Sequence, residues 1–220
     1  MILYYSNGSP FARKVRIVLH EKGIPFEADV DDRLRPIAES AGPTLAVPFL
    51  DDNGQQLRES DVIIDYLLRT YPDAQGASID PPLSPWLTRP ERHWDDMVTL
   101  ATINAYADSM VNLRLMAPDA VTPANSDYMA RQLARVDHCL DWLEGRVTDA
   151  GFAPGWFSIM DIAFICPTVY CETRDVLPWR GRPKLEALYE RYQSRPSLLA
   201  TPINHLPPIS SRYIMTRTLI

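Results

Sequence analysis

Cysteine and histidine are scarce in this 220-residue sequence, and neither is arranged to hold a disulfide framework or a metal. Only Cys139, Cys166 and Cys171 occur, an odd number without a C-x-x-C pair. They fall in segments with helical patterns, so we predict buried free thiols. The four histidines show no zinc-ligand spacing. We therefore expect no bound metal.

An excess of positive charge and long apolar runs are also missing. Lys and Arg number 22 against 28 Asp and Glu, a formal net charge of −6. A nucleic-acid-binding face requires positive charge, so we expect no nucleic-acid partner. No apolar run approaches the ~18 residues of a membrane span, and the first residues do not resemble a secretory signal. We expect no membrane association and a cytoplasmic location.

Common catalytic motifs are absent too. The sequence has no G-x-S-x-G, P-loop or G-x-G-x-x-G pattern. Three adjacent carboxylate pairs occur, and we interpret them as solvated turn or surface residues, because neighbouring side chains usually point apart. The pairs are Asp31-Asp32, Asp51-Asp52 and Asp95-Asp96.

The first third of the chain alternates strands and helices. Apolar and aromatic runs, turn residues and helix caps predict the order β-α-β-α-β-β-α. Pro48 lies inside an apolar run, where a cis Val47-Pro48 bond would fit. Asn53-Gly54 indicates a hairpin turn. The expected elements are strands at 2–5, 25–30 and 55–58, a further strand that Pro48 opens or flanks within the run 45–50, and helices at 10–22, 33–41 and 59–71.

A proline-rich stretch then separates this part from an entirely helical remainder. Five prolines fall between 72 and 90, which is typical of a linker. We predict domains at 1–75 and 91–220, joined by 76–90, with helices near 91–116, 125–147 and 183–195, another that begins at Ser158 and lies in the core, and an irregular tail. The apolar stripe of the first long helix, which includes Trp94, Met97 and Val98, is typical of a core.

Two helix starts carry distinct signals. Ser9 followed by Pro10 is typical of an N-cap and first helical residue, and by itself indicates only a cap. Ser158 and Asp161 form a predicted structural capping box, whose loss would cost about 0.5–2 kcal/mol. In the first helix, Arg13, Lys14, Arg16 and His20 fall largely opposite the apolar face.

Several short motifs together resemble the cytosolic glutathione transferase family. They are Ser9-Pro10-Phe11-x-x-Lys14-Val15-Arg16, Val47-Pro48-x-Leu50, Leu57-x-Glu59-Ser60-x-x-Ile63, Phe157-Ser158-x-x-Asp161-Ile162-Ala163 and Arg195-Pro196-Ser197. They occur in the family's order and at its spacing, across nearly the whole chain. The chain is identified as a member of this family.

The resemblance implies an α/β thioredoxin-like domain followed by an all-α domain. Ser9 would be the catalytic residue, donating a hydrogen bond to the glutathione thiolate at the N-terminus of the first helix. Ala12 replaces the second cysteine of redox relatives, so the chain is more similar to serine-type members such as the tau and zeta classes, or to a bacterial member. Tyr5 and Ser6 remain alternatives to Ser9.

The family's glutathione site maps onto four further residues. The backbone of Val47 would pair with the cysteinyl unit, and Pro48 would shape the turn, whereas Glu59 and Ser60 would bind the γ-glutamyl end. Many relatives carry a lysine before the Val-Pro step, where this chain has Leu45-Ala46. Arg13, Lys14 and Arg35 are candidates to replace it, and the expected electrophile pocket contains Phe11, Asn104, Tyr106 and Met110.

The implied activity is conjugation of glutathione, as co-substrate, to a small hydrophobic electrophile in detoxification, by a homodimer. One alternative is a glutathione-dependent isomerase or dehalogenase using the same site. Another is a non-catalytic glutathione-binding protein with this fold. Retention on immobilised glutathione without turnover would favour the second alternative.

Overall fold

A four-stranded mixed sheet organises the first domain of the computed structural model, which describes residues 1–30, 46–71 and 89–203. The strands are β1 (Ile2–Tyr5), β2 (Glu27–Val30), β3 (Phe49–Asp52) and β4 (Gln55–Arg58). Their order is β2-β1-β3-β4. β1 and β2 are parallel, whereas β3 is antiparallel to both β1 and β4. This is the thioredoxin-like arrangement that the sequence predicts.

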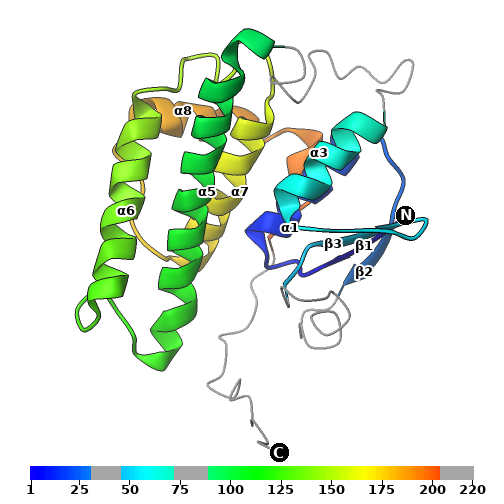
Figure 1. Cartoon of the computed structure of the whole chain (residues 1–220). Coiled ribbons are helices and arrows are strands. Elements are labelled where there is room, and N and C mark those ends of the chain that lie inside the picture. The colour runs from blue at the N-terminus through cyan, green and yellow to red at the C-terminus, as the bar shows by residue number, and fades with distance from the viewer. Residues whose placement is uncertain (31–45, 72–88, 204–220) are drawn as a thin grey trace, which may run out of the picture.

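Two helices, α1 (Pro10–Glu21) and α3 (Ser60–Thr70), pack side by side on one face of this sheet (Figure 1). Their apolar faces meet strand residues such as Leu3 and Leu50, which are fully buried. The β3–β4 hairpin turns at Asn53 and Gly54, whose φ angles are 54° and 90°. Positive φ at both central residues is what a tight hairpin requires, so the predicted turn is confirmed.

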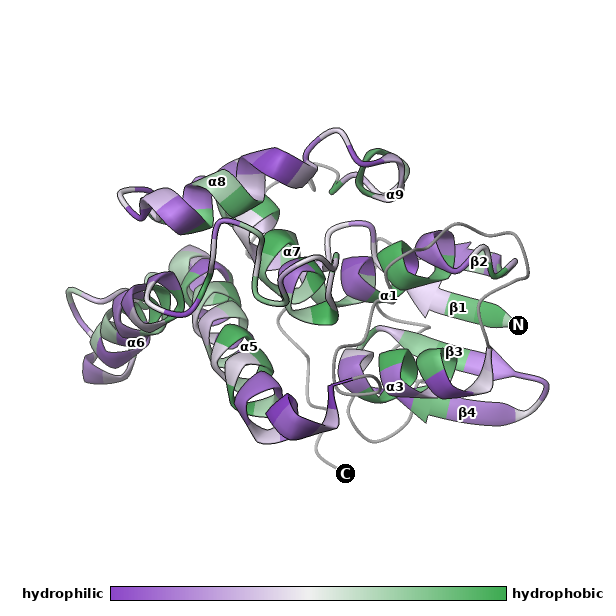
Figure 2. Ribbon diagram, turned by 90° about the horizontal axis from the view of Figure 1, so that it is seen from above, coloured by the Kyte–Doolittle hydropathy of each residue, from purple (hydrophilic) through white to green (hydrophobic). Residues whose placement is uncertain are grey.

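The second domain is helical throughout its described part. Its long helices are α5 (His93–Met116), α6 (Asp127–Glu144) and α7 (Ile159–Arg174), followed by α8 (Pro183–Tyr192) and α9 (Pro196–Leu199), with short 3₁₀ turns at Pro90–Arg92 and Ala117–Asp119. α7 lies in the middle, with α5, α8 and the first domain's α1 packed around it (Figure 2). It is accordingly buried along nearly its whole length.

The capping box at the start of α7 is confirmed. The Ser158 Oγ accepts a hydrogen bond from the Asp161 N–H at 3.3 Å, and an Asp161 oxygen accepts from the Ser158 N–H at 2.7 Å. The other Asp161 oxygen accepts from the Phe152 N–H at 3.1 Å. Burial raises the pKa of this carboxyl to about 6, although the hydrogen bonds from Phe152 and Ser158 oppose the shift.

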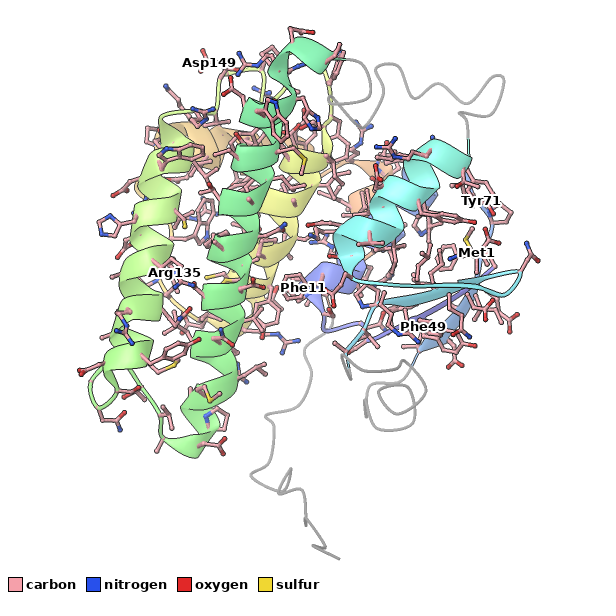
Figure 3. The ribbon with its side chains drawn as sticks, viewed as in Figure 1. Met1, Phe11, Phe49, Tyr71, Arg135 and Asp149 are labelled. Carbon is pink, nitrogen blue, oxygen red and sulfur yellow. The ribbon has the colours of Figure 1, made fainter. Side chains whose placement is uncertain are left out.

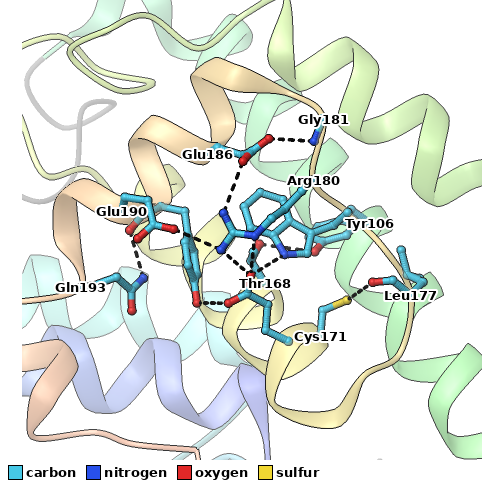
Figure 4. A network of polar contacts seen from close by, with 12 residues as sticks. Tyr106, Thr168, Cys171, Leu177, Arg180, Gly181, Glu186, Glu190 and Gln193 are labelled. Carbon is cyan, nitrogen blue, oxygen red and sulfur yellow. Dashed lines mark hydrogen bonds and ion pairs between the residues drawn. The ribbon is translucent and has the colours of Figure 1, made fainter.

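An ionic and aromatic cluster fastens α8 to α7 (Figure 4). The Arg180 guanidinium lies 2.6 Å from a Glu172 oxygen and also pairs with Glu186 and Glu190. Glu172 accepts further hydrogen bonds from the Trp179 indole and the Tyr189 hydroxyl, at 3.1 and 2.6 Å. One carboxylate thus joins the end of α7 to the following loop and helix, which gives this cluster a structural role.

The polar face of α1 is buried, although its charged residues suggest a solvated surface. Arg13, Lys14 and Arg16 are 4%, 2% and 6% exposed, because this face packs against α7, α9 and α5. The Arg13 guanidinium donates to the carbonyls of Thr201 and Leu198 at 2.6 and 3.2 Å. Arg16 lies over the Tyr5 ring at 4.6 Å. The Arg13 contacts thus join α1 to the second domain, whereas the Arg16 contact lies within the first.

A second contact between the domains involves Glu21, at the C-terminal end of α1. Arg195, just before α9, makes two 2.6 Å hydrogen bonds to the two oxygens of Glu21. The Ser197 hydroxyl donates to the same carboxylate. A bidentate pair of this geometry fixes orientation as well as distance, so α1 is held by the second domain at both ends.

Two interpretations of the sequence are wrong. Asp52 is not solvated: it is 6% exposed and accepts hydrogen bonds from the hydroxyls of Tyr66 and Tyr71. Asp96 is 2% exposed and pairs with Arg89 at 3.0 Å. In both cases a local rule about neighbouring carboxylates cannot anticipate a partner supplied by a distant residue.

The apolar stripe at the start of α5 is also not core. Trp94, Met97 and Val98 are 78%, 39% and 52% exposed, because the helix turns its other side, with Leu100 and Ile103, toward the domain core. All three cysteines are free and buried, as predicted.

Several predictions lie outside the described residues. They are the helix at 33–41, Arg35, Leu45, most of the linker and the end of the tail. The domain boundaries therefore stay predictions. Among the helices that the structure describes, none is long and apolar enough to cross a membrane.

Candidate functional site

A cleft of about 170 Å³ opens between the two domains. Residues far apart in the sequence meet around it: Phe11, Ala46, Val47, Pro48, Glu59, Ser60 and Asp108. The first six come from the sheet domain and Asp108 comes from α5. Phe11, at the start of α1, lies at the boundary with the helical domain (Figure 3). The structure thus brings together five residues that the sequence analysis assigns to glutathione or its electrophile.

Ser9 lies two residues before Phe11, at the N-terminus of α1. Its Oγ accepts a hydrogen bond from the Ala12 N–H at 3.2 Å, which confirms the predicted cap. Its side chain is partly exposed, whereas Tyr5 and Ser6 are only 6% and 3% exposed. The Ser6 Oγ accepts from the Gly8 N–H at 3.2 Å. Of these three hydroxyls, that of Ser9 is the most accessible from solvent.

The peptide bond between Val47 and Pro48 is cis, as the sequence suggested. It immediately precedes β3, so the chain enters the sheet directly from the wall of the cleft. Pro48 is buried and Val47 is partly exposed. Val47 is therefore the member of this pair that a bound molecule can reach.

Glu59 and Ser60 form the opposite wall, where β4 passes into α3. Glu59 has a φ of 65° and a ψ of 124°, an uncommon conformation for a residue with a side chain. Such strain occurs preferentially at binding sites. The Glu59 side chain does not cap α3, and the first N–H groups of a helix favour an anion. The two residues thus place a carboxylate beside an anion-binding helix end.

Lys14 stabilises this wall from its buried side. Its ammonium lies 2.6 Å from an Asp61 oxygen and 3.2 Å from the Asn104 amide oxygen. The Asn104 amide nitrogen donates in turn to Asp61. Asp61 directly follows Ser60, so α1 and α5 together fix the first turn of α3.

Three of the predicted electrophile-pocket residues do not line the cleft. Tyr106 and Met110 are fully buried inside the helical domain, where Tyr106 stacks against Phe164 with centroids 6.1 Å apart. Asn104 is bound to Lys14 and Asp61. The helix carrying them was placed correctly, but its rotation, set by packing on α6 and α7, turns Asp108 toward the cleft instead.

Two of the three cations proposed to replace the missing lysine are already engaged. Arg13 binds the Thr201 and Leu198 carbonyls, and Lys14 binds Asp61 and Asn104. Both side chains are buried. Neither lines the cleft, and Arg35 lies outside the described residues.

Asp108 is the cleft residue that sequence reasoning missed. It stands one helical turn after Asn104, on the same side of α5. That spacing is the signal that identifies it once Asn104 is placed near the site. Burial, together with the nearby Asp61 and Glu59, raises the pKa of its carboxyl, while Lys14 and Arg135 oppose the shift. Within residues 1–30, 46–71 and 89–203, no cluster of His, Cys, Asp or Glu is arranged to hold a metal ion.

Comparison with known proteins identifies the family. The model for the glutathione S-transferase N-terminal domain matches residues 3–76, and that for the C-terminal domain matches residues 126–191. An uncharacterized GST-like protein of Escherichia coli K12, YibF, is 29% identical over 91% of this chain and 98% of its own length. Glutathione S-transferase U8 of Arabidopsis thaliana is 34% identical over 44% of this chain and 46% of its own.

Solved structures of other proteins resemble this chain over almost its full length. A glutathione transferase family member of Pseudomonas fluorescens Pf-5 with bound glutathione has a TM-score of 0.78 at 27% identity, covering 92% of this chain and 98% of that one. A Methylobacterium radiotolerans glutathione S-transferase in complex with glutathione sulfonate has a TM-score of 0.76 at 27% identity, covering 94% and 96%. With both domain models matched in sequence order, the chain belongs to the cytosolic glutathione S-transferase family.

Proposed function

We propose that the protein is a glutathione transferase that conjugates glutathione to a small electrophile in the cleft between its domains. The observation that carries this proposal is the meeting of Val47, Pro48, Glu59 and Ser60 around one cleft, beside the N-terminus of α1. Solved relatives that hold glutathione or glutathione sulfonate support it. In the reaction, the thiolate forms a C–S bond, and the leaving group departs with its electron pair.

Ser9 activates the thiol in this proposal. An ordinary thiol of pKa about 8.5 is only a few per cent thiolate at pH 7, and lowering its pKa by ~2 units requires about 2.7 kcal/mol. A helix N-terminus supplies about 1 kcal/mol and a hydrogen bond to a charged group about 1.5–3 kcal/mol. The two together are sufficient. The Ser9 oxygen already accepts from Ala12, which leaves its proton available for the thiolate.

The γ-glutamyl end of glutathione carries a carboxylate and an ammonium side by side. The first N–H groups of α3, at Ser60 and after it, suit the carboxylate. The Glu59 carboxylate suits the ammonium. The rigid support of this turn by Lys14, Asp61 and Asn104 keeps the two charges at a fixed separation.

The test is the pKa of the bound glutathione thiol, followed by the ultraviolet absorbance of the thiolate in the wild type and in Ser9→Ala. A lost hydrogen bond to the thiolate raises that pKa by about 1–2 units. Ser6→Ala is the matched control and leaves it unchanged. An unchanged pKa in Ser9→Ala refutes the serine assignment, and failure of the wild type to bind glutathione refutes the proposed function. Binding without turnover of any aryl halide would leave a non-catalytic binding protein.

We further propose a homodimer. Trp94, Met97, Val98 and Ala101 follow one another at helical spacing along one side of α5 and are all exposed. An apolar stripe of this kind marks an interaction surface, and a second copy of the chain is its proposed occupant. Light scattering tests this: Trp94→Lys gives a monomer, whereas Trp142→Lys, on the exposed side of α6, remains dimeric. A monomeric wild type contradicts the proposal.

A further inference from the structure

One wall of the cleft is left for the second substrate when glutathione occupies the rest. The proposed function assigns Val47, Pro48, Glu59 and Ser60 to the tripeptide. The remaining side chains among the described lining residues are those of Phe11, Asp108 and the small Ala46. The second substrate must therefore contact an aromatic ring from α1 and a carboxylate from α5.

The Asp108 carboxylate is available for such a contact. Its side chain is open to solvent on one side and partly desolvated by the surrounding residues, and it makes no hydrogen bond or ion pair with any residue in the described part of the chain. Asp61 and Glu59, both acidic, lie close enough to influence its charge, as do the basic Lys14 and Arg135. A cation entering the cleft would give Asp108 a counter-ion.

The described lining of the cleft contains acidic side chains and no basic one. Lys14, the nearest cation on α1, is 2% exposed, and its ammonium is bound to Asp61 and Asn104. A negatively charged electrophile would thus meet the Asp108 carboxylate with only Lys14 and Arg135, neither of which lines the cleft, to offset it, whereas a positively charged one would be attracted.

We propose that Asp108 determines the charge specificity of the second substrate, favouring cationic electrophiles with an aromatic or other flat apolar part and disfavouring carboxylates. This inference rests on the proposed function, because it assigns the wall that glutathione leaves free. Phe11 contacts the apolar part, and a cation beside an aromatic ring gains further attraction. Asp108 takes no part in the bond-making step. The thiolate sulfur forms a bond to the electrophile's carbon, and the leaving group departs, without transfer of a proton to Asp108.

Three electrophiles that share one reactive ring provide the test. They are 4-chloro-3-nitrobenzoate, 4-chloro-3-nitrobenzamide and (4-chloro-3-nitrobenzyl)trimethylammonium, which are anionic, neutral and cationic. Because their intrinsic reactivities differ, each kcat/KM is compared between the wild type and Asp108→Asn. We expect Asp108→Asn to lower kcat/KM about fivefold for the cation and to raise it about fivefold for the carboxylate, as for a partly exposed charge pair. For the amide, kcat/KM should change by less than about twofold.

Controls separate charge from structure. Asp95→Asn removes an exposed carboxylate from the same helix. Its relative kcat/KM values for the three electrophiles should equal those of the wild type. Asp108→Glu should keep the wild-type preference. The preference should also weaken at 1 M salt, because screening shortens the range of charge interactions to about 3 Å. A structural effect of the substitution would change all three substrates alike and would not depend on salt.

Two results overturn the inference. Equal changes for the three electrophiles in Asp108→Asn, or none, would show that Asp108 does not set specificity, while the proposed function stands. A wild type that binds no glutathione and converts none of the three would overturn the proposed function and the inference together.

Discussion

Lys14 and Asp61 form an ion pair of 2.6 Å between α1 and α3, with side chains 3% and 37% exposed. Asn104, from α5, contacts both partners. The pair lies directly beneath the turn at Glu59 and Ser60, so one buried ammonium connects three helices to the wall of the cleft. This arrangement makes the geometry of the first domain's site depend on the second domain.

Replacing Lys14 by methionine should destabilise the protein by about 2 kcal/mol. The value is below that of a fully buried pair, because Asp61 is partly hydrated once its partner is lost. Urea unfolding measures it. Arg69→Met removes an exposed ion pair with Asp65 on α3 and should change the free energy of unfolding by less than about 0.5 kcal/mol. Equal effects of both substitutions would contradict the role assigned to Lys14.

Gly151 and Gly155 provide a matched pair for the capping box. Both have positive φ, 102° and 84°, but a Cβ on Gly151 would lie 3.0 Å from an Asp161 oxygen, whereas one on Gly155 meets nothing within 4 Å. Gly151→Ala should therefore cost about 3 kcal/mol, through backbone strain and disturbed hydrogen bonds, and Gly155→Ala about 1 kcal/mol from strain alone. Thermal or urea unfolding of the two variants decides this.

The stability of the protein should depend on the pH through Asp161. Burial raises its pKa in the folded state to about 6, above the unfolded value of about 3.9. Between these values the folded state binds more protons, so this contribution to stability falls as the pH rises. Between pH 4.5 and 7 the free energy of unfolding should fall by about 2 kcal/mol relative to Asp161→Asn. Parallel pH profiles for the two proteins would refute this.

Tyr71 should ionise unusually late. Its hydrogen bond to Asp52 raises the pKa of the phenol to about 12, and the same carboxylate raises the pKa of Tyr66. In Asp52→Asn both values should return toward about 10. Absorbance of tyrosinate during an alkaline titration measures the shift, and Tyr71→Phe identifies the residue. In Tyr71→Phe the absorbance change near pH 12 should fall by the amount of one tyrosine, and an unchanged absorbance change there would show that another residue is responsible.

The successful sequence predictions concern residues whose roles depend on near neighbours. The Ser9 cap, the Asn53-Gly54 turn and the Ser158–Asp161 box each require only a few consecutive residues. In these three cases the physical cause, a hydrogen bond or a φ angle that the residue tolerates, is local. Glu59 and Ser60 were assigned through the resemblance to a family; both line the cleft, and their binding of glutathione stays a prediction.

The failures concern residues whose partners come from elsewhere. The apolar spacing in α5 predicts a helix, but it does not predict which side of the helix packs against α6 and α7. The sequence therefore placed Trp94 in the core and Tyr106 in the substrate pocket. Asp52 accepts hydrogen bonds from Tyr66 in α3 and from Tyr71 at the end of that helix. Asp108 lines the cleft because α5 packs across from Phe11.

By itself, therefore, the sequence determined the order of the elements, the helix caps, the hairpin turn and the family. Short-range sterics, capping hydrogen bonds and apolar periodicity act within a few residues, and the chain records them directly. Only the tertiary structure decided that Lys14 is buried between three helices rather than exposed, and that Asp108 contributes a carboxylate to the cleft. Both follow from the packing of two domains against each other, which fixes the rotation of each helix by contacts between residues many positions apart.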